Sequence, residues 1–239
     1  MGLPMRVLVV VFQKGGIGDP GRHAVAHALR QDDVNVRVVA RDPDMLSEIL
    51  NEDLLHSPRL TKFQADPAND TSSLKESMRG AEAVVSTLGN RQIGFERFGA
   101  QGTANVIQAM QENKVKRLVC ISSVGINEDW PPMKWNWKIC FAFSTMLMTV
   151  LRSAYQDLSR LELNVRQAED IDYLIVRPCG LDPGEVPIGS WKLRTSDSDG
   201  SPLAEQVAKA DVGQFMVQEA LLPTLHNTAI TIGQPLQEQ

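Results

Sequence analysis

The strongest constraint on the fold is a continuous apolar run that leads into a cluster of glycines. Residues 6–12 read Arg-Val-Leu-Val-Val-Val-Phe, and after two residues the chain continues Gly15-Gly16-Ile17-Gly18-Asp19-Pro20-Gly21. An uninterrupted β-branched run is typical of a parallel strand that is covered on both faces. Because a helical pattern begins at Arg22, the glycines are expected to form the turn of a strand–turn–helix unit.

The same alternation continues and predicts an α/β protein. Strands are expected at residues 34–40, 60–64, 83–87, 117–122, 173–176, 191–194 and 229–233, and helices at 22–30, 44–51, 71–79, 96–113, 151–168 and 207–222. This order favours a Rossmann-type, doubly wound parallel sheet with a small C-terminal substrate lobe. We expect a single domain over residues 1–239, in which residues 126–150 and 180–205 form a cap over a ligand bound at the carboxyl ends of the strands.

Three glycines at a spacing of three residues have a mechanical interpretation in this context. Gly15 allows the tight turn, Gly18 lets a pyrophosphate approach the backbone, and Gly21 lets the helix pack closely on the strand. Free N–H groups at the helix N-terminus then face the phosphates. The segment from Lys14 also resembles the start of a nucleoside-triphosphatase P-loop, but Asp19 and Pro20 stand where that loop needs Lys-Ser or Lys-Thr.

The end of the second strand indicates which dinucleotide is bound. NAD sites carry an acidic residue there for the ribose 2′-hydroxyl, whereas NADP sites use arginine for the 2′-phosphate. The chain reads Ala40-Arg41-Asp42, so Arg41 favours NADP(H), while Asp42 keeps NAD as an alternative. Arg22, directly after the glycine loop, is a candidate second cation.

Composition excludes several other classes of protein. The net charge of -5 argues against a non-specific nucleic-acid binder, which needs a basic face. The three cysteines and four histidines follow no metal-binding spacing, so no metal site is predicted. The longest apolar run, residues 139–151, is too short to span a membrane. Without a signal sequence or paired cysteines, the chain is expected to be cytoplasmic.

Several further segments follow one another in a specific order. They read VRVVARDP at 36–43, ADP at 65–67, AEAVVSTLG at 81–89, VKRLVCISS at 115–123, DYLIVRP at 172–178, and ADVG at 210–213. Together with the glycine loop and residues 228–233, this order resembles the atypical short-chain dehydrogenases/reductases. Within them, it resembles the NAD(P)H-binding branch that includes biliverdin/flavin reductases and NmrA-like proteins. The resemblance extends over nearly the whole chain.

The resemblance implies a set of cofactor contacts. Asp66 would lie beside the adenine, and Thr87, Leu88 and Gly89 would line the ribose and phosphates. Ser122 and Ser123 would lie near the nicotinamide, and Pro178 would close over it. Taken singly, each residue is better explained by a structural role, but the set favours a cofactor site. The candidate cofactor-binding residues are thus Gly15, Gly18, Asp19, Pro20, Gly21, Arg22, Arg41, Asp66, Thr87, Leu88, Gly89 and Pro178, and the candidate catalytic residues are Ser122 and Ser123.

Two features depart from the family pattern. Residues 11–14 look like an insertion before the glycine loop, which means either a longer first strand or an altered entry to the loop. The second concerns Tyr155, the tyrosine in the expected helix 151–168. Ser159 follows it four residues later, where typical short-chain dehydrogenases place the lysine that lowers the tyrosine pKa. Tyr155 is therefore interpreted as a packing residue.

These residues lead to two hypotheses for function. The first is an NADPH-dependent oxidoreductase that transfers a hydride to a flavin, quinone or similar conjugated acceptor, which can take its proton from water. The second is a non-catalytic redox sensor or assembly protein of the NmrA-like type. The aromatic segment 130–148 is interpreted as a platform for a planar apolar acceptor, or alternatively as a homodimer, protein-partner or membrane-contacting surface.

Overall fold

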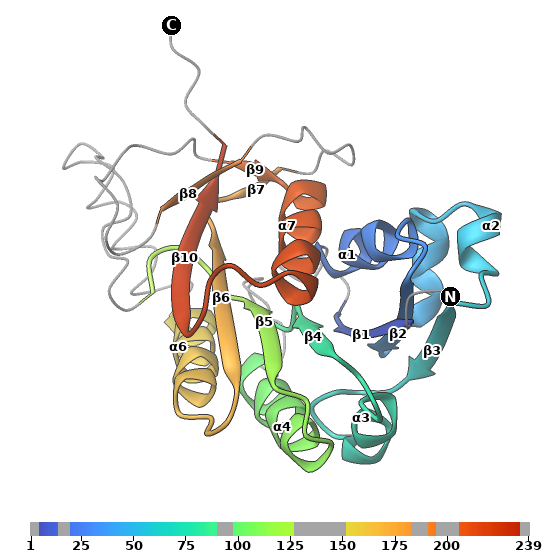
Figure 1. The fold of residues 1–239 in the computed structure, drawn as a ribbon. Coiled ribbons are helices and arrows are strands. Elements are labelled where there is room, and N and C mark those ends of the chain that lie inside the picture. The colour runs from blue at the N-terminus through green and yellow to red at the C-terminus, as the bar shows by residue number, and fades with distance from the viewer. Residues whose placement is uncertain are drawn as a thin grey trace, which may run out of the picture.

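An eight-stranded sheet forms the centre of the protein in a computed structural model that describes residues 5–13, 20–89, 98–126, 152–182, 191–194 and 206–234 (Figure 1). In spatial order its strands are β3 (Leu60–Gln64), β2 (Val34–Ala40), β1 (Arg6–Val11), β4 (Ala83–Ser86), β5 (Arg117–Ile121), β6 (Asp172–Pro178), β10 (Thr228–Gly233) and β8 (Lys192–Arg194). All neighbours pair in parallel except β8, which is antiparallel to β10. The expected Rossmann-type fold is confirmed.

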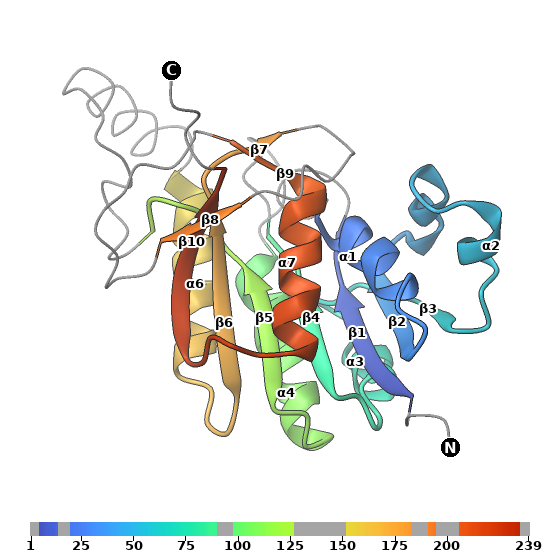
Figure 2. The same ribbon diagram turned by 45° about the horizontal axis from the view of Figure 1, so that its top comes forward.

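Helices cover both faces of this sheet. Figure 2 shows α1 (Pro20–Leu29) and α7 (Lys209–Leu221) on one face, and α3 (Thr71–Ser77), α4 (Gly99–Glu112) and α6 (Arg152–Arg166) on the other. Because both faces are covered, the central strand β1 is apolar after Arg6, and its residues 8–11 have no exposed surface. The core therefore lies in two layers, one on each side of the sheet.

The observed elements differ from the predicted ones at two places. Residues 44–51, expected as a helix, form the 3₁₀ turn η2 (Pro43–Glu48), which is followed by the short helix α2 (Glu52–Leu55). The segment is too short to propagate an α-helix, and 3₁₀ bonding is usual for such connectors. A small parallel sheet of β7 (Leu181–Asp182) and β9 (Val207–Ala208) was not predicted, because two-residue strands carry no periodic signal. It lies beyond the carboxyl ends of β6 and β10 (Figure 2).

The start of α4 is fixed by a residue of another helix. Asp157 of α6 accepts hydrogen bonds from the backbone N–H groups of Gly99, at 2.9 Å, and Ala100, at 3.2 Å. The first N–H groups of a helix have no partner within it, and a carboxylate also complements the helix dipole. Asp157 is thus a structural carboxylate that joins α4 to α6.

A fully buried ion pair links α6 to the central sheet. Arg177 in β6 donates from Nε to Glu162 Oε1 at 2.9 Å and from Nη2 to Oε2 at 2.6 Å, and the two side chains are 3% and 0% exposed. Such a bidentate pair compensates two charges that would be very costly to bury singly.

Substitutions of Glu162 and Arg177 should have non-additive effects on the free energy of unfolding. Glu162→Leu is expected to lower the free energy of unfolding by about 3–5 kcal/mol, because Arg177 stays buried without this carboxylate. The double variant Glu162→Leu/Arg177→Met should be more stable than the single variant. Urea unfolding followed by circular dichroism measures both, and a double variant less stable than Glu162→Leu would contradict this interpretation.

Candidate functional site

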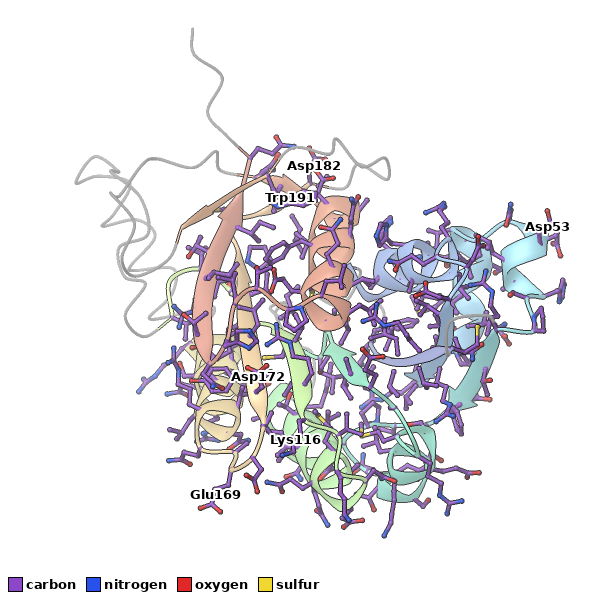
Figure 3. The ribbon with its side chains drawn as sticks, viewed as in Figure 1. Asp53, Lys116, Glu169, Asp172, Asp182 and Trp191 are labelled. Carbon is purple, nitrogen blue, oxygen red and sulfur yellow. The ribbon has the colours of Figure 1, made fainter. Side chains whose placement is uncertain are left out.

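The carboxyl ends of successive parallel strands gather the residues that the sequence singled out. Arg41 follows β2, Asp66 lies two residues after β3, Thr87, Leu88 and Gly89 follow β4, Ser122 and Ser123 follow β5, and Pro178 ends β6. In open α/β sheets, ligands bind outside these ends at the point where the strand order reverses, here between β1 and β4. Figure 3 shows the orientation: Asp182 and Trp191 lie at the carboxyl end, and Lys116 and Glu169 at the opposite one.

Arg41 is held from two sides. Its Nη2 lies 3.1 Å from Asp66 Oδ2, and its Cζ lies 5.1 Å from the centroid of the Phe98 ring. The side chain is 35% exposed, so a ligand has access to it. A guanidinium stacked on an aromatic face keeps its in-plane donors directed sideways, in the fork geometry that matches phosphate oxygens.

Asp66 forms a rigid acceptor beside Arg41. Its Oδ1 accepts from the backbone N–H of Ala68 at 3.0 Å, and its Oδ2 accepts from Asn69 Nδ2 at 2.9 Å. Partial burial acts to raise the pKa of Asp66, but the hydrogen bonds from Asn69, Ala68 and Arg41 outweigh it, so that the pKa is lowered. The side chain is therefore an oriented carboxylate at neutral pH.

Gly21 sets the distance between α1 and the sheet. A Cβ at this position would lie 2.4 Å from Phe12 Cβ and 2.5 Å from Thr87 Oγ1, so only glycine fits. β1 ends at Val11, and Phe12 already lies beyond the strand. Of residues 11–14, which look like an insertion, Val11 is the last residue of the strand. Lys14 and residues 15–18 lie outside the described residues, so an altered entry to the glycine loop stays a prediction.

Of the remaining loop residues, Pro20 is buried at the start of α1. Gly15, Gly18 and Asp19 lie outside the described residues, so their predicted phosphate contacts stay predictions.

Thr87 and Leu88 are fully buried after β4, and the Thr87 backbone N–H donates to Val11 O at 2.9 Å. Gly89 follows with φ of +147°, a conformation that favours glycine. Gly89 is the residue at which the resemblance places the cofactor's ribose and phosphates, together with Thr87 and Leu88.

The serines after β5 have different surroundings. Ser122 Oγ is buried and has no hydrogen-bond partner within the part of the chain that the structure describes. Ser123 Oγ lies 3.2 Å from Val124 O and 3.5 Å from the Tyr155 hydroxyl, which itself donates to Val124 O at 3.3 Å. Ser122 is therefore the serine with unused hydrogen-bonding capacity, because a buried hydroxyl normally has a partner.

Sequence reasoning missed the closeness of Tyr155 to Ser123. The sequence signal for this closeness was the position of Tyr155 in the first turn of α6. The first turn of a helix that follows a parallel strand lies near the carboxyl ends of the strands, where Ser123 is located. Because its proton is directed at a main-chain carbonyl, the geometry fits a positioning role for Tyr155 better than proton transfer.

Arg22 and Pro178, two further predicted cofactor-binding residues, lie next to other parts of the fold. Arg22, in the first turn of α1, forms an ion pair through Nη1 with Glu48 Oε2 at the end of η2. Pro178 is buried at the end of β6, and the following Cys179 donates its N–H to Ile232 O at 3.1 Å. The aromatic segment 130–148 lies outside the described residues. Of the two predicted cap segments, the structure describes residues 126, 180–182 and 191–194.

Comparison with known proteins assigns the family. The profile of a family described as NAD(P)H-binding matches residues 15–222, which is most of the chain. The protein belongs to this NAD(P)H-binding family of atypical short-chain dehydrogenases/reductases, a family of NAD(P)H-dependent oxidoreductases.

Curated relatives come from Arabidopsis thaliana. An uncharacterised chloroplastic protein is 26% identical over 227 residues, which cover 88% of this chain and 73% of the relative. Two 3β-hydroxysteroid dehydrogenase/decarboxylase isoforms are 33% and 32% identical over 124 residues, or 47% of this chain. The matched segment spans only 28% and 22% of the length of these two enzymes.

Solved structures agree on the fold. A short-chain dehydrogenase/reductase from Veillonella parvula, in complex with NADP, has a TM-score of 0.73 at 16% identity and covers 96% of this chain and 95% of its own. ChuY, described as an anaerobilin reductase from Escherichia coli O157:H7, has a TM-score of 0.70 at 21% identity, with coverage of 98% and 99%. In the described ranges of our chain, no helix is long and apolar enough to cross a membrane.

The hydrogen bonds of Asp66 predict a pH-dependent contribution to stability. Asp66→Asn should lower the free energy of unfolding at neutral pH by about 0.5–1 kcal/mol, a partly screened effect. Since the folded-state pKa lies below the usual 3.8, the contribution is present above that pH and is lost as the pH falls through the folded-state pKa. Urea unfolding of both proteins, repeated at decreasing pH, should show the difference shrinking in acid. A difference that does not change with pH would show that the carboxylate charge is not its source.

Proposed function

We propose that this protein is an NADPH-dependent oxidoreductase that transfers a hydride to a flavin, quinone or similar conjugated acceptor. The observation that carries the proposal is the row of candidate residues across the carboxyl ends of β2 to β6, in a chain of the NAD(P)H-binding family. Arg41, a cation suited to the 2′-phosphate, stands at one end of this row, and the buried hydroxyl of Ser122 stands near the other. An extended dinucleotide would place its adenosine half at the first and its nicotinamide at the second.

Arg41 supports NADP(H) over NAD(H). It is the first residue after β2, its guanidinium is stacked on Phe98, and Asp66 orients it. Asp42, which would favour NAD, is exposed and lies one residue further on, at the start of η2. The NADP complex of the structural neighbour from Veillonella parvula is consistent with this choice.

The residues of this chain would bind and orient the cofactor and do little of the chemistry. Bound NADPH supplies the hydride. Gly89 and the buried Thr87 shape the path of the ribose and phosphates, and Ser122 Oγ offers a hydrogen bond to the acceptor or the nicotinamide amide. Conjugated acceptors suit a site in which Tyr155 has no lysine four residues later, since water can supply their proton.

The choice of a conjugated acceptor rests on the residue four positions after Tyr155, which is Ser159. Alcohol oxidation, as in the steroid dehydrogenase relatives, normally needs a tyrosine with a nearby lysine, and here Ser159 replaces that lysine. The name of ChuY, an anaerobilin reductase, supports a conjugated acceptor such as a linear tetrapyrrole. In this proposal, residues 126–150 and 180–205 form the cap, apart from β8, which belongs to the central sheet. The aromatic segment 130–148 contacts the acceptor.

Loss of Arg41 should weaken the binding of NADPH selectively. Arg41→Ala is expected to raise the Kd for NADPH about 10- to 100-fold, the value of one or two charge-assisted hydrogen bonds, and to leave NADH nearly unchanged. Quenching of protein fluorescence on titration with each nucleotide measures both constants. Arg160→Ala, an exposed arginine of α6, is the control, and equal behaviour of the two variants would contradict the assignment of Arg41.

Catalysis can be tested with a panel of flavins, quinones and linear tetrapyrroles. At least one should cause loss of NADPH absorbance, and Ser122→Ala/Ser123→Ala should lower kcat about tenfold or more, because a hydrogen-bond donor is removed from the reacting end. Ser72→Ala, in the solvent-exposed part of α3, is the control. NADPH binding without oxidation by any acceptor would favour the redox-sensor hypothesis, and unchanged kcat in the double variant would make the serines structural.

A further inference from the structure

Both arginines suited to a 2′-phosphate pair with a carboxylate: Arg41 pairs with Asp66, and Arg22 pairs with Glu48 from the neighbouring η2. Arg22 lies in the first turn of α1, directly after the glycine loop, and is only 13% exposed. Its Nη1 pairs with Oε2 of Glu48, which is 49% exposed at the end of η2. A carboxylate oxygen thus occupies a donor that a phosphate oxygen would use, because both anions bind guanidinium through the same N–H groups.

Glu48 also borders a cavity on the outer side of α1. The cavity has a volume of about 330 Å³ and lies between α1, the η2–α2 segment and the start of α7. Among the residues that line it with Glu48 are His27, Arg30 and Asn51. Burial and the charge of Arg30 lower the pKa of His27. An arginine side chain keeps its charge in proteins, so Arg30 is a cation in the cavity wall.

We propose that Glu48 is a specificity-determining residue that competes with the cofactor's 2′-phosphate for Arg22, and that NADPH binding displaces it toward Arg30 in this cavity. The inference rests on the proposed NADPH function and adds a residue that no glycine-loop or strand-end pattern identifies. Glu48 has room to move because it is half exposed and borders the open cavity.

The 2′-phosphate is expected to replace Glu48 at Arg22, and not the reverse. A 2′-phosphate carries more negative charge than a carboxylate and offers three oxygens, so it prevails at Arg22. The loss of the Arg22–Glu48 pair lowers the net affinity for NADPH, and Arg30 offsets part of this loss. NADH has no 2′-phosphate, so it leaves the ion pair in place. Glu48 therefore acts on the binding of one nucleotide and not of the other.

Removal of the charge of Glu48 tests the competition directly. Glu48→Gln is expected to lower the Kd for NADPH about three- to tenfold and to leave the Kd for NADH unchanged, a range typical of one partly screened ion pair. Titration calorimetry with NADPH, NADH and 2′,5′-ADP measures this, and 2′,5′-ADP should follow NADPH because it carries the same 2′-phosphate. Glu52→Gln is the matched control, since Glu52 is an exposed neighbour that pairs with His56.

The role of the cavity is tested by a double-mutant cycle. Arg30→Ala should weaken NADPH binding about two- to fivefold in the wild-type background and have no effect in the Glu48→Gln background. Additive effects would overturn the displacement toward Arg30. Unchanged NADPH affinity in Glu48→Gln, with a wild-type protein that prefers NADPH, would overturn the competition while leaving the proposed function intact. A wild-type protein that binds no NADPH would overturn the proposed function itself.

Discussion

The close approach of α1 to the sheet at Gly21 is the contact on which the site depends. Without a side chain at this position, the first turn of the helix lies directly against Phe12 and Thr87, which follow two adjacent parallel strands. The strand order reverses there, so the helix N-terminus lies at the edge of the sheet where open α/β folds bind ligands. Any residue larger than glycine would push α1 outward and carry Arg22 and its ion pair away from this edge.

The sequence allowed most of the fold to be predicted because burial on both sides of a parallel sheet leaves a simple signal. Strands 34–40 and 60–64 agree with the structure to the residue, and the others agree to within a few positions. Failures occurred where that signal is missing: at η2, where a short connector has helical spacing without helical length, and at β7 and β9, which are too short to show a period.

The positions of the candidate site residues along the edge of the sheet were predictable, because these residues follow strands that the sequence pattern shows. Arg41 was predicted from its place after the second strand, whereas Asp66 and Ser122 were predicted from the family resemblance alone. The structure places all three just after strands of the sheet. Contacts between distant elements were not predictable, since no local pattern encodes them. The pairing of Arg22 with Glu48, the stacking of Arg41 on Phe98 and the approach of Tyr155 to Ser123 all join segments that only the tertiary fold brings together.

The capping of α4 by Asp157 has a consequence for the residue just before the helix. A helix usually takes its N-cap from the residue just before it, which restricts the connecting segment to a few residue types. Here α6 supplies the cap from 57 positions later in the chain. Phe98, the residue just before α4, therefore needs no capping side chain, and its ring is available to contact Arg41. The start of the helix is thus tied to α6, and the residue before it is free to serve the candidate site.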